Sequence, residues 1–395
     1  MTNSLQQSSA TSFSIALIAL IAGLCSANYT LIDSFSGASF FDDFVFFNET
    51  DPSHGFVQYV TFPTAVDEKY VGIVEPADGQ RWAYVGVDQS PTAFLGRPSV
   101  RMTSRQSWTH GLLVADIRAA PTGCGLWPAL WLVNPQTWPG STGEIDVFEA
   151  VHDTELNTMS LHTSPGCVMW NATSLFSGHM TTSDCDVAAQ YQSINAGCSV
   201  EAPSNESLTT DYPATDYPTA GARFNADGGG TYVMEWTSAD IAMFFFPRGS
   251  TPRDIELGRP MPSTWTKKPL ARFMGSGCVL DDHVANLSLV INTNICGDWA
   301  GQTWQSSGCA SKTGVSSCEA YMANTPQGLA QAFWLINKVD VYQQGQNIMP
   351  ESSSVAGGQE NASATSLVTP NVVAVNANPT QSPAVLSSLR SLRSL

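Results

Sequence analysis

Short segments in which apolar and polar residues alternate, or in which apolar residues predominate, recur along most of the chain. Each is at most ten residues long and is bounded by Gly, Pro, Asn or Ser, a pattern that predicts strands separated by turns. The predicted strands cover residues 82–87, 112–118, 145–151, 232–236, 241–246, 287–292 and 333–342. No convincing amphipathic helix follows any of them, which favours antiparallel sheets over βαβ units.

We therefore expect an all-β protein in which two antiparallel sheets pack as a sandwich. Asp340 lies between Val339 and Val341, which is the period of two expected for a strand with one face in solvent. The composition is uniform over residues 29–343, without an internal repeat. Residues 28–350 are therefore expected to form one domain.

The two ends of the chain differ from this domain. Residues 15–24 form a ten-residue apolar run, which fits the core of a signal peptide over residues 1–27 and is too short to span a bilayer. Residues 351–395 contain no aromatic residue and are expected to be a disordered tail. Arg390 and Arg393 interrupt the hydrophobic stretch that a lipid-anchor signal requires, so no membrane anchor is expected.

Cysteine content and glycosylation sequons indicate an oxidising compartment. Removal of Cys25 with the signal peptide leaves eight cysteines, an even number that fits four disulfides. We expect Cys309 and Cys318 to pair, because Gly308, Gly314 and the small residues between them favour a short closed loop. Together with the cysteines, N-x-[ST] sequons predict a secreted protein, extracellular or in the cell wall. These sequons begin at Asn28, Asn48, Asn171, Asn205, Asn286 and Asn361.

Charge and composition narrow the range of functions. The chain has 34 acidic and 17 basic residues, a formal net charge of -17, which argues against electrostatic binding to nucleic acid. Neither the phosphate-binding motif G-x-x-x-x-G-K-[ST] nor the nucleophile motif G-x-S-x-G occurs. No sequence feature calls for an organic cofactor. A structural calcium ion stays an open alternative, but no loop has convincing ligand spacing for it, so no metal is expected. We expect a monomer.

The segment 143–151, GEIDVFEAV, places three acidic residues among apolar ones. On a regular strand Glu144 and Asp146 share a face, and Glu149 points to the other. A β-bulge between Asp146 and Glu149 would gather the three carboxyls in one groove. Such a group fits retaining glycoside hydrolysis, in which one carboxylate attacks the anomeric carbon and a protonated carboxyl donates to the leaving oxygen. The alternative is a solvated acidic face of a strand.

The motif GEIDVFE, preceded by GCGLWPALW and followed by LHT, resembles the catalytic strand of glycoside hydrolase family 16, the laminarinase-like β-glucanases. GRPSVR, FNADGGGTYVMEW, FFFPR and NICGDWAGQ extend the resemblance to secreted basidiomycete laminarinases over about residues 29–343. The resemblance implies a concanavalin-type jelly roll whose concave sheet the substrate crosses. It also implies Glu144 as nucleophile, Asp146 as its assisting acid, Glu149 as general acid/base and His162 beside them.

The same resemblance implies residues that line a glucan cleft. A pyranose ring has apolar faces and polar edges, so a tryptophan suits it as a platform with an N–H donor. Trp127, by contrast, has apolar neighbours and is expected to be a core residue. The residues implied for the cleft are Trp131, Trp138, Trp299, Arg97 and Arg101.

Three functions fit these observations. The favoured one is a secreted, retaining endo-β-1,3(4)-glucanase that hydrolyses laminarin-type or mixed-linkage β-glucan. A cell-wall glucan transglycosylase would use the same intermediate with a sugar hydroxyl as acceptor. A non-catalytic β-glucan-binding protein would be expected to lack a catalytic glutamate, whereas both Glu144 and Glu149 are present.

Overall fold

The computed structural model describes residues 29–75, 79–138, 143–169, 174–204, 217–275, 277–324 and 326–345. The predicted signal peptide 1–27 and the predicted tail 351–395 lie outside these residues. The predicted domain boundaries therefore stay predictions.

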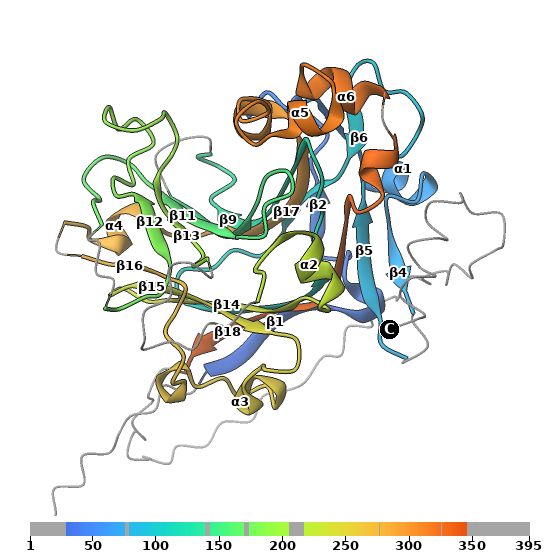
Figure 1. Cartoon of the computed structure of the whole chain (residues 1–395). Helices are drawn as coiled ribbons and strands as arrows, with labels where there is room; N and C mark the ends of the chain where they lie inside the picture. The colour runs from blue at the N-terminus through green and yellow to red at the C-terminus, as the bar shows by residue number, and fades with distance from the viewer. Residues whose placement is uncertain are drawn as a thin grey trace, which may run out of the picture.

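Two large antiparallel sheets face each other and form the body of the protein (Figure 1). The strands of the first sheet are β1 Tyr29–Ser36, β4 Val71–Val74, β5 Trp82–Gly86, β8 Gly111–Ala119, β14 Gly230–Trp236, β15 Ile241–Pro247, β16 Ala271–Phe273 and β18 Phe333–Gln344. Their order across the sheet is β16-β15-β14-β8-β18-β5-β4, and β1 also pairs with β18.

The second sheet carries the acidic segment. Its strands are β2 Phe44–Phe46, β7 Arg101–Ser104, β9 Leu126–Val133, β10 Glu144–Glu149, β11 Thr158–His162, β12 His179–Thr182, β13 Cys198–Glu201 and β17 Ser288–Ile295. Their order is β12-β13-β11-β10-β9-β17-β7-β2, so β10 lies well inside the sheet. A separate parallel pair joins β3 Val57–Tyr59 to β6 Arg97–Ser99. The all-β sandwich and all seven predicted strands are confirmed.

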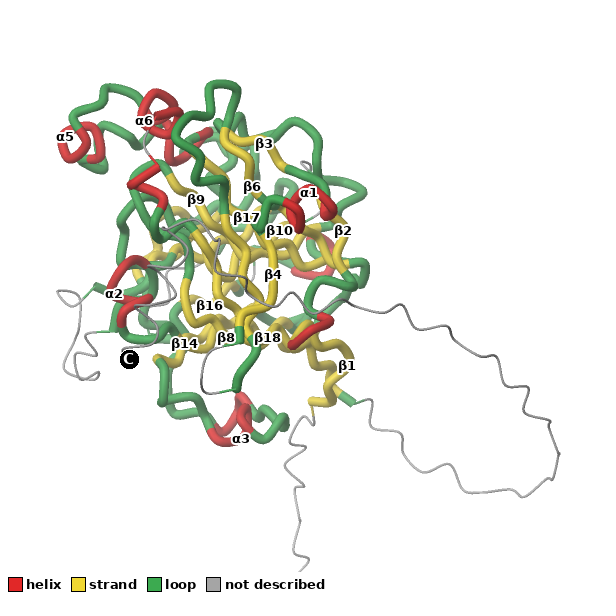
Figure 2. Tube along the Cα trace, turned by 90° about the vertical axis from the view of Figure 1, so that its right-hand side faces the viewer, coloured by secondary structure: helices red, strands yellow, loops and turns green. Residues whose placement is uncertain are grey.

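The helices are short and lie at the periphery. They are α1 Phe62–Asp67, α2 Gly221–Ala226, α3 Arg253–Glu256, α4 Leu280–His283, α5 Cys309–Thr313 and α6 Cys318–Asn324. In both Figure 1 and Figure 2, α5 and α6 lie at one end of the molecule and α3 at the other. Within the described ranges, no helix combines the length and apolar character needed to cross a bilayer. The remaining helical turns are Gly37–Ser39, Pro262–Thr264, Pro326–Leu329 and the π-turn η4 Gly297–Gly301.

The main core lies between the two sheets. The ring of Phe148 in β10 packs against Trp334 and Tyr232 of the opposite sheet, with ring centroids 5.2 and 5.5 Å apart. Ile145 and Val147 of the same strand are also fully buried. These apolar side chains anchor β10 to the core and leave its acidic residues for the outer face of the sheet.

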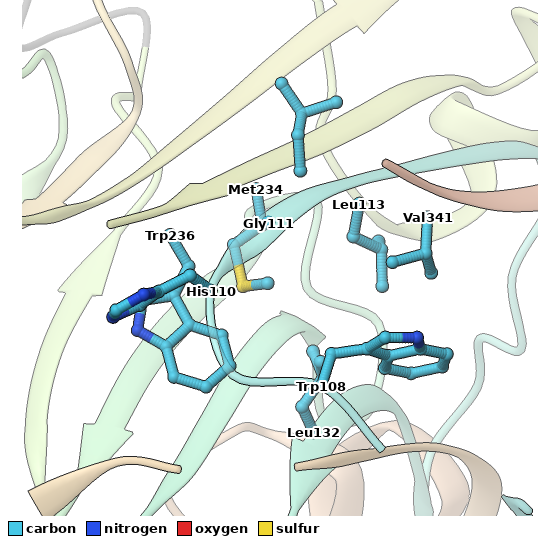
Figure 3. Close-up of a pocket in the computed structure, with 9 residues that line it drawn as sticks. Trp108, His110, Gly111, Leu113, Leu132, Met234, Trp236 and Val341 are labelled. Atoms are coloured by element: carbon cyan, nitrogen blue, oxygen red, sulfur yellow. The ribbon is translucent and has the colours of Figure 1, made fainter. Parts of the chain in front are cut away.

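A small gap remains in this core near the turn that contains His110 (Figure 3). Leu132 comes from the β10 sheet, whereas Leu113, Met234 and Val341 come from the opposite one. Because its lining is mostly apolar and it lies between the sheets, the gap is a packing irregularity without candidate chemistry.

Asp340, which alternates with Val339 and Val341 in β18, does not face solvent as predicted. Asp340 is only 3% exposed, and its carboxylate accepts hydrogen bonds from Ser34 Oγ at 2.7 Å and from the Lys338 ammonium at 2.5 Å. Tyr342, two residues further, packs in an apolar cluster with Ile255 of α3. The prediction that this face is solvated is therefore wrong, because α3 and polar partners cover it.

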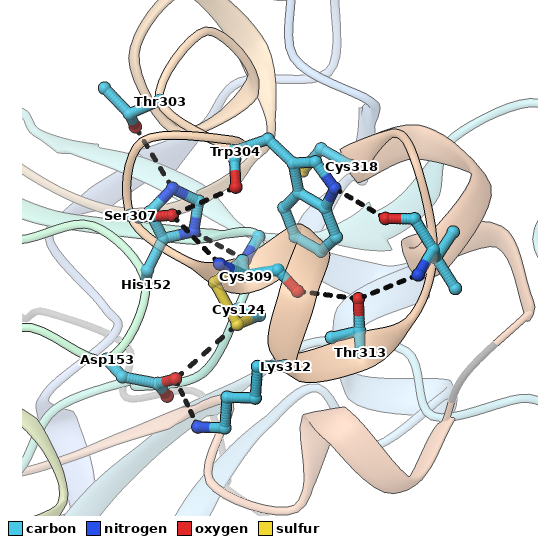
Figure 4. Close-up of a disulfide and its surroundings, with 12 residues drawn as sticks. Cys124, His152, Asp153, Thr303, Trp304, Ser307, Cys309, Lys312, Thr313 and Cys318 are labelled. Atoms are coloured by element: carbon cyan, nitrogen blue, oxygen red, sulfur yellow. Dashed lines mark hydrogen bonds and ion pairs between the residues drawn. A yellow bond between two sulfur atoms is a disulfide. The ribbon is translucent and has the colours of Figure 1, made fainter.

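Residues 297–324 form a lobe at one end of β9 and β17, which we call the 297–324 lobe. Cys124–Cys309 ties it to the start of β9 (Figure 4), and Cys296–Cys318 ties it to the end of β17. The predicted pair of Cys309 with Cys318 is wrong, because α5 and α6 each direct their cysteine to the sheet rather than to one another. Four disulfides were predicted and are present, the other two being Cys167–Cys278 and Cys185–Cys198.

Candidate active site

The acidic strand contains the predicted bulge. In the pairing of β10 with β11, Asp146 lies opposite Ser160, and Glu149 lies opposite Thr158. Two residues of β10 thus face a single residue of β11 between these pairs. A register shift also separates Asp146 from Phe148 in the pairing with β9. The bulge sends Val147 and Phe148 into the core and brings Glu149 to the face of Glu144 and Asp146.

His162 of β11 joins this group of carboxyls. It lies opposite Glu144 in the strand register, and its Nε2 is 3.0 Å from Asp146 Oδ2 and 3.9 Å from Glu144 Oε1. Burial disfavours the imidazolium, but the negative charges of Glu144 and Asp146 outweigh this effect and raise the pKa of His162 to about 9. At neutral pH a cationic His162 therefore compensates part of the negative charge.

Glu144 has an indole beside it. Trp138 Nε1–H donates a hydrogen bond to its carboxylate, and the Trp138 ring lies 5.5 Å from that of Trp131. Burial and then the Asp146 carboxyl raise the pKa of Glu144 to about 7, while His162, the Trp138 hydrogen bond and Arg101 lower it. Three contacts thus favour the Glu144 anion.

Glu149 has an indole of its own. Trp127 Nε1–H donates to Glu149 Oε1 at 2.7 Å, and the ring of Trp299 stands edge-on to Trp127 at 5.9 Å and 85°. Burial and the neighbouring Asp146 raise the pKa of Glu149 well above its usual value, while the Trp127 hydrogen bond and His162 act in the opposite direction. The environment of Glu149 therefore favours a carboxyl that keeps its proton.

Arg101 is buried and contacts two of the predicted cleft tryptophans, Trp131 and Trp138. Its guanidinium lies over the rings of Trp138 at 4.5 Å, Trp131 at 5.0 Å and Phe47 at 4.8 Å. Trp131 donates its N–H to Asn292 Oδ1 at 2.7 Å and is buried. Arg101 and Trp131 thus belong to the site mainly by supporting Trp138.

Arg97 lies outside the site. Its side chain is 0% exposed, and its guanidinium donates to the carbonyl of Met322 at 2.6 Å and to Asp88 Oδ2 at 2.8 Å. The prediction that Arg97 lines the cleft is wrong, because β6 directs this side chain under the 297–324 lobe. Arg97 instead fastens α6 to the loop that contains Asp88.

Trp127 is the site residue that sequence reasoning missed. It is half-buried and bonded to a glutamate, so its interpretation as a core residue is wrong. The signal was present: in a strand, residues two and four apart share a face, so Trp127 must point to the same side as Trp131. The apolar neighbours that suggested a core position belong to the opposite face.

Two groups of potential metal ligands occur among the described residues. In one, donor atoms of Glu144, Asp146 and His162 lie within 4.8 Å of one another; the other consists of Cys124, Asp153 and Cys309. The second group uses both its sulfurs in a disulfide. In the first, the raised pKa of His162 means that a metal ion would have to displace a proton from the ring at neutral pH. The group suits acid/base chemistry.

A jelly-roll sandwich with two partly buried glutamates and aromatic neighbours defines a glycoside hydrolase. Residues 44–342 match the family described as the XgeA-like catalytic domain of glycoside hydrolase family 16, and the chain belongs to that family. The predicted fold, family and enzyme class are thereby confirmed.

Relatives and solved structures agree with this assignment. The chain is 37% identical to an endo-1,3(4)-β-glucanase of Arthroderma benhamiae, with 83% of this chain and 68% of that protein covered. It is 35% identical to a probable glycosidase of Schizosaccharomyces pombe, with 80% and 69% covered.

Two similar solved structures bear glucan-related names. One is laminarinase 16A of Phanerochaete chrysosporium, 36% identical with a TM-score of 0.68, holding 6-O-glucosyl-laminaritriose in donor and acceptor sites. The other is an elongating family 16 β-1,3-glucosyltransferase, 36% identical with a TM-score of 0.69. Each comparison covers 80% of this chain and 100% of the other.

Proposed function

We propose that the protein is a retaining endo-β-1,3(4)-glucanase that hydrolyses laminarin-type or mixed-linkage β-glucan. The observation that carries this proposal is the bulge in β10, which brings Glu144, Asp146 and Glu149 to one face. An indole N–H bonded to each glutamate supports it. The β-glucan substrate follows from the names of the relatives.

In the first step, the Glu144 carboxylate attacks the anomeric carbon and forms a glycosyl ester, while Glu149 donates its proton to the departing oxygen. Esterification removes the charge of Glu144, so negative charge near Glu149 falls and its carboxyl releases a proton more readily. Asp146 and His162 keep the local charge balanced during this exchange.

In the second step, Glu149 acts as a base. It takes a proton from a water molecule that attacks the anomeric carbon, which releases the sugar and regenerates Glu144. Two displacements leave the β configuration of the product unchanged. Trp138 and Trp299 are the proposed platforms for sugar rings, since both residues are partly exposed, Trp138 is bonded to Glu144 and Trp299 packs against Trp127.

We further propose that the protein is secreted, with residues 1–27 as its signal peptide and 351–395 as a tail outside the catalytic domain. Four disulfides support this location, because such bonds persist in oxidising compartments. Monomeric behaviour is part of the same proposal.

A second candidate is β-1,3-glucan transglycosylation, favoured by the similarity to an elongating β-1,3-glucosyltransferase. In that reaction a sugar hydroxyl replaces water in the second step. Both activities pass through the same intermediate, so their ratio depends on the acceptor.

The test is product analysis by mass and linkage after incubation with laminarin, lichenan, cellulose and xyloglucan. We expect shorter oligosaccharides from laminarin or lichenan, and Glu144→Gln should lower turnover by about 10⁴-fold or more because an amide cannot attack. Products longer than the substrate would favour the transglycosylase. Binding without any product would contradict both enzyme functions.

A further inference from the structure

The bulge that brings Glu149 to the catalytic face is held by one side chain. Asn157 Nδ2–H donates to the carbonyl of Val147 at 2.9 Å, and Asn157 Oδ1 accepts from the backbone N–H of Glu149 at 2.8 Å. The amide therefore bonds backbone groups on both sides of Phe148, inside the stretch where the β10–β11 register is interrupted. In a regular strand, backbone groups of the neighbouring strand form such hydrogen bonds. At the bulge the Asn157 side chain forms them instead.

Asn157 is itself fixed in place. Its side chain is 0% exposed, its backbone N–H donates to Thr219 Oγ1 at 2.8 Å, and its carbonyl accepts from the N–H of Ala202 at 2.8 Å. The two segments that hold it are far from β10 in the sequence. The amide thus has little freedom to follow β10 if the bulge changes shape.

We propose that Asn157 is a positioning residue for catalysis, which fixes the bulge so that the Glu149 carboxyl reaches the leaving oxygen. This inference rests on the proposed role of Glu149. On the other side of the strand, the Trp127 N–H holds the carboxyl itself. Backbone and side chain of Glu149 are then constrained separately, and among the described residues only the Asn157 side chain hydrogen-bonds the Glu149 backbone.

The hydrogen bonds of Asn157 position Glu149, the proposed acid/base, and not Glu144, the proposed nucleophile. Glu144 lies before the bulge, in the part of β10 that pairs regularly with His162 and Leu161 of β11. Losing the Asn157 amide should therefore displace Glu149 while leaving Glu144 able to attack. A displacement of about 1 Å can cost about 100-fold in rate.

Asn157→Asp is the informative variant. Aspartate keeps the shape and can still accept from the Glu149 N–H, but its carboxylate cannot donate to the Val147 carbonyl and repels it. Asn225→Asp is the matched control: the Asn225 amide also bonds a backbone N–H and C=O, those of Ala120, at 2.9 Å each. Its hydrogen bonds involve no residue of the site.

The test compares laminarin with 2,4-dinitrophenyl β-laminaribioside, whose leaving group departs without protonation, in the presence of azide, which replaces the water that Glu149 would activate. Glu149→Ala is measured in parallel. For Asn157→Asp we expect laminarin kcat/KM to fall about 100-fold, the dinitrophenyl reaction with azide to fall less than about tenfold, and β-glycosyl azide to form. Asn225→Asp should leave the ratio of the two activities unchanged.

Each failure has a separate meaning. If Asn157→Asp and Asn157→Ala lose both activities equally, or keep laminarin activity while folded, Asn157 is a purely structural residue and the inference is wrong. If Glu149→Ala itself shows no preference for the activated substrate, the assignment of Glu149 fails, and with it the proposed function.

Discussion

The two glutamates proposed to be catalytic differ in the single hydrogen bonds and charges around them. Trp138 and Trp127 each donate one N–H, but only Glu144 also receives a lowering influence from Arg101. Burial and then the neighbouring Asp146 carboxyl raise the pKa of both Glu144 and Glu149. Three contacts lower the pKa of Glu144 against two for Glu149, so Glu144 loses its proton more readily, as double displacement requires of the nucleophile.

The hydrogen bond from Trp127 makes a prediction about pH dependence. It lowers the pKa of Glu149, so Trp127→Phe should raise that pKa, and Glu149 should keep its proton to higher pH. The alkaline limb of kcat/KM against pH should therefore move to higher pH. Trp131→Phe is the control, because Trp131 donates to Asn292 instead. A limb that stays in place or moves to lower pH in Trp127→Phe would contradict the role of this bond.

Trp299 tests whether an aromatic residue binds sugar or supports the fold. We expect Trp299→Ala to reduce laminarin kcat/KM with little change in melting temperature, because the ring is partly exposed in η4. Trp334→Ala provides the contrast, since Trp334 is fully buried and its truncation should cost about 3–5 kcal/mol of stability. A low melting temperature with unchanged kinetics for Trp299→Ala would make it a structural residue.

The sequence predicted the bulge that gathers the proposed catalytic residues because these residues share one short segment. Period-two alternation and the bulge needed to align Glu144 with Glu149 are local properties, and β10 has both. Arg97 and the cysteine pairs could not be reached in this way. Their partners, such as Met322 for Arg97 and Cys124 for Cys309, lie far away in the sequence and meet only in the folded lobe.

Among the elements, the 297–324 lobe carries Trp299 of the candidate site and is held to the sheet by two disulfides, Cys124–Cys309 and Cys296–Cys318. Trp299 extends from η4 at the start of this lobe, and Trp304 packs deeper in a small core with Met322 and Leu329. His152 lies just beyond β10, and its Nε2 is 3.1 Å from Thr303 Oγ1 of the lobe (Figure 4). The lobe thus sets the position of Trp299 relative to the catalytic strand.

Removing Cys124–Cys309 should loosen this lobe. We expect the double variant Cys124→Ser/Cys309→Ser to lose about 2–5 kcal/mol of stability and to be cleaved by protease first within residues 297–324. Laminarin kcat/KM should fall through the displacement of Trp299.

The control is Cys167→Ser/Cys278→Ser, which removes another long-range disulfide away from the lobe. It should lower stability without directing cleavage to residues 297–324. Equal cleavage patterns in the two double variants, measured by limited proteolysis and mass spectrometry, would show that Cys124–Cys309 does not hold the lobe.

For the whole molecule, titration of Glu144 and His162 should lower stability as pH rises from about 4.5 to 9. The folded pKa of Glu144 is about 7 against a usual 4.5, so the fold retains this proton and its contribution is lost as pH rises from 4.5 through 7. The pKa of His162 is raised to about 9, so its contribution is complete below 6.5 and is lost as pH rises through 9. The net charge of -17 adds electrostatic self-repulsion, which also lowers the stability of the folded state.

Glu144→Gln reduces both parts of this dependence. The variant lacks the titrating carboxyl and the charge that does most to raise the pKa of His162, so its melting temperature should fall less than that of the wild type between pH 4.5 and 9. Calorimetry across this range gives the comparison. Parallel curves for the two proteins would mean that Glu144 is not held in a protonated state by the fold.

We propose that Glu144 and Glu149 act in two displacements on one face of β10, and the stereochemistry of the first product distinguishes this mechanism from a single displacement. Proton NMR during the first turnovers on a laminarin oligosaccharide resolves the anomer formed at the new reducing end before mutarotation. Two displacements should give the β anomer first. Initial formation of the α anomer would mean a single displacement and would contradict the roles assigned to both glutamates.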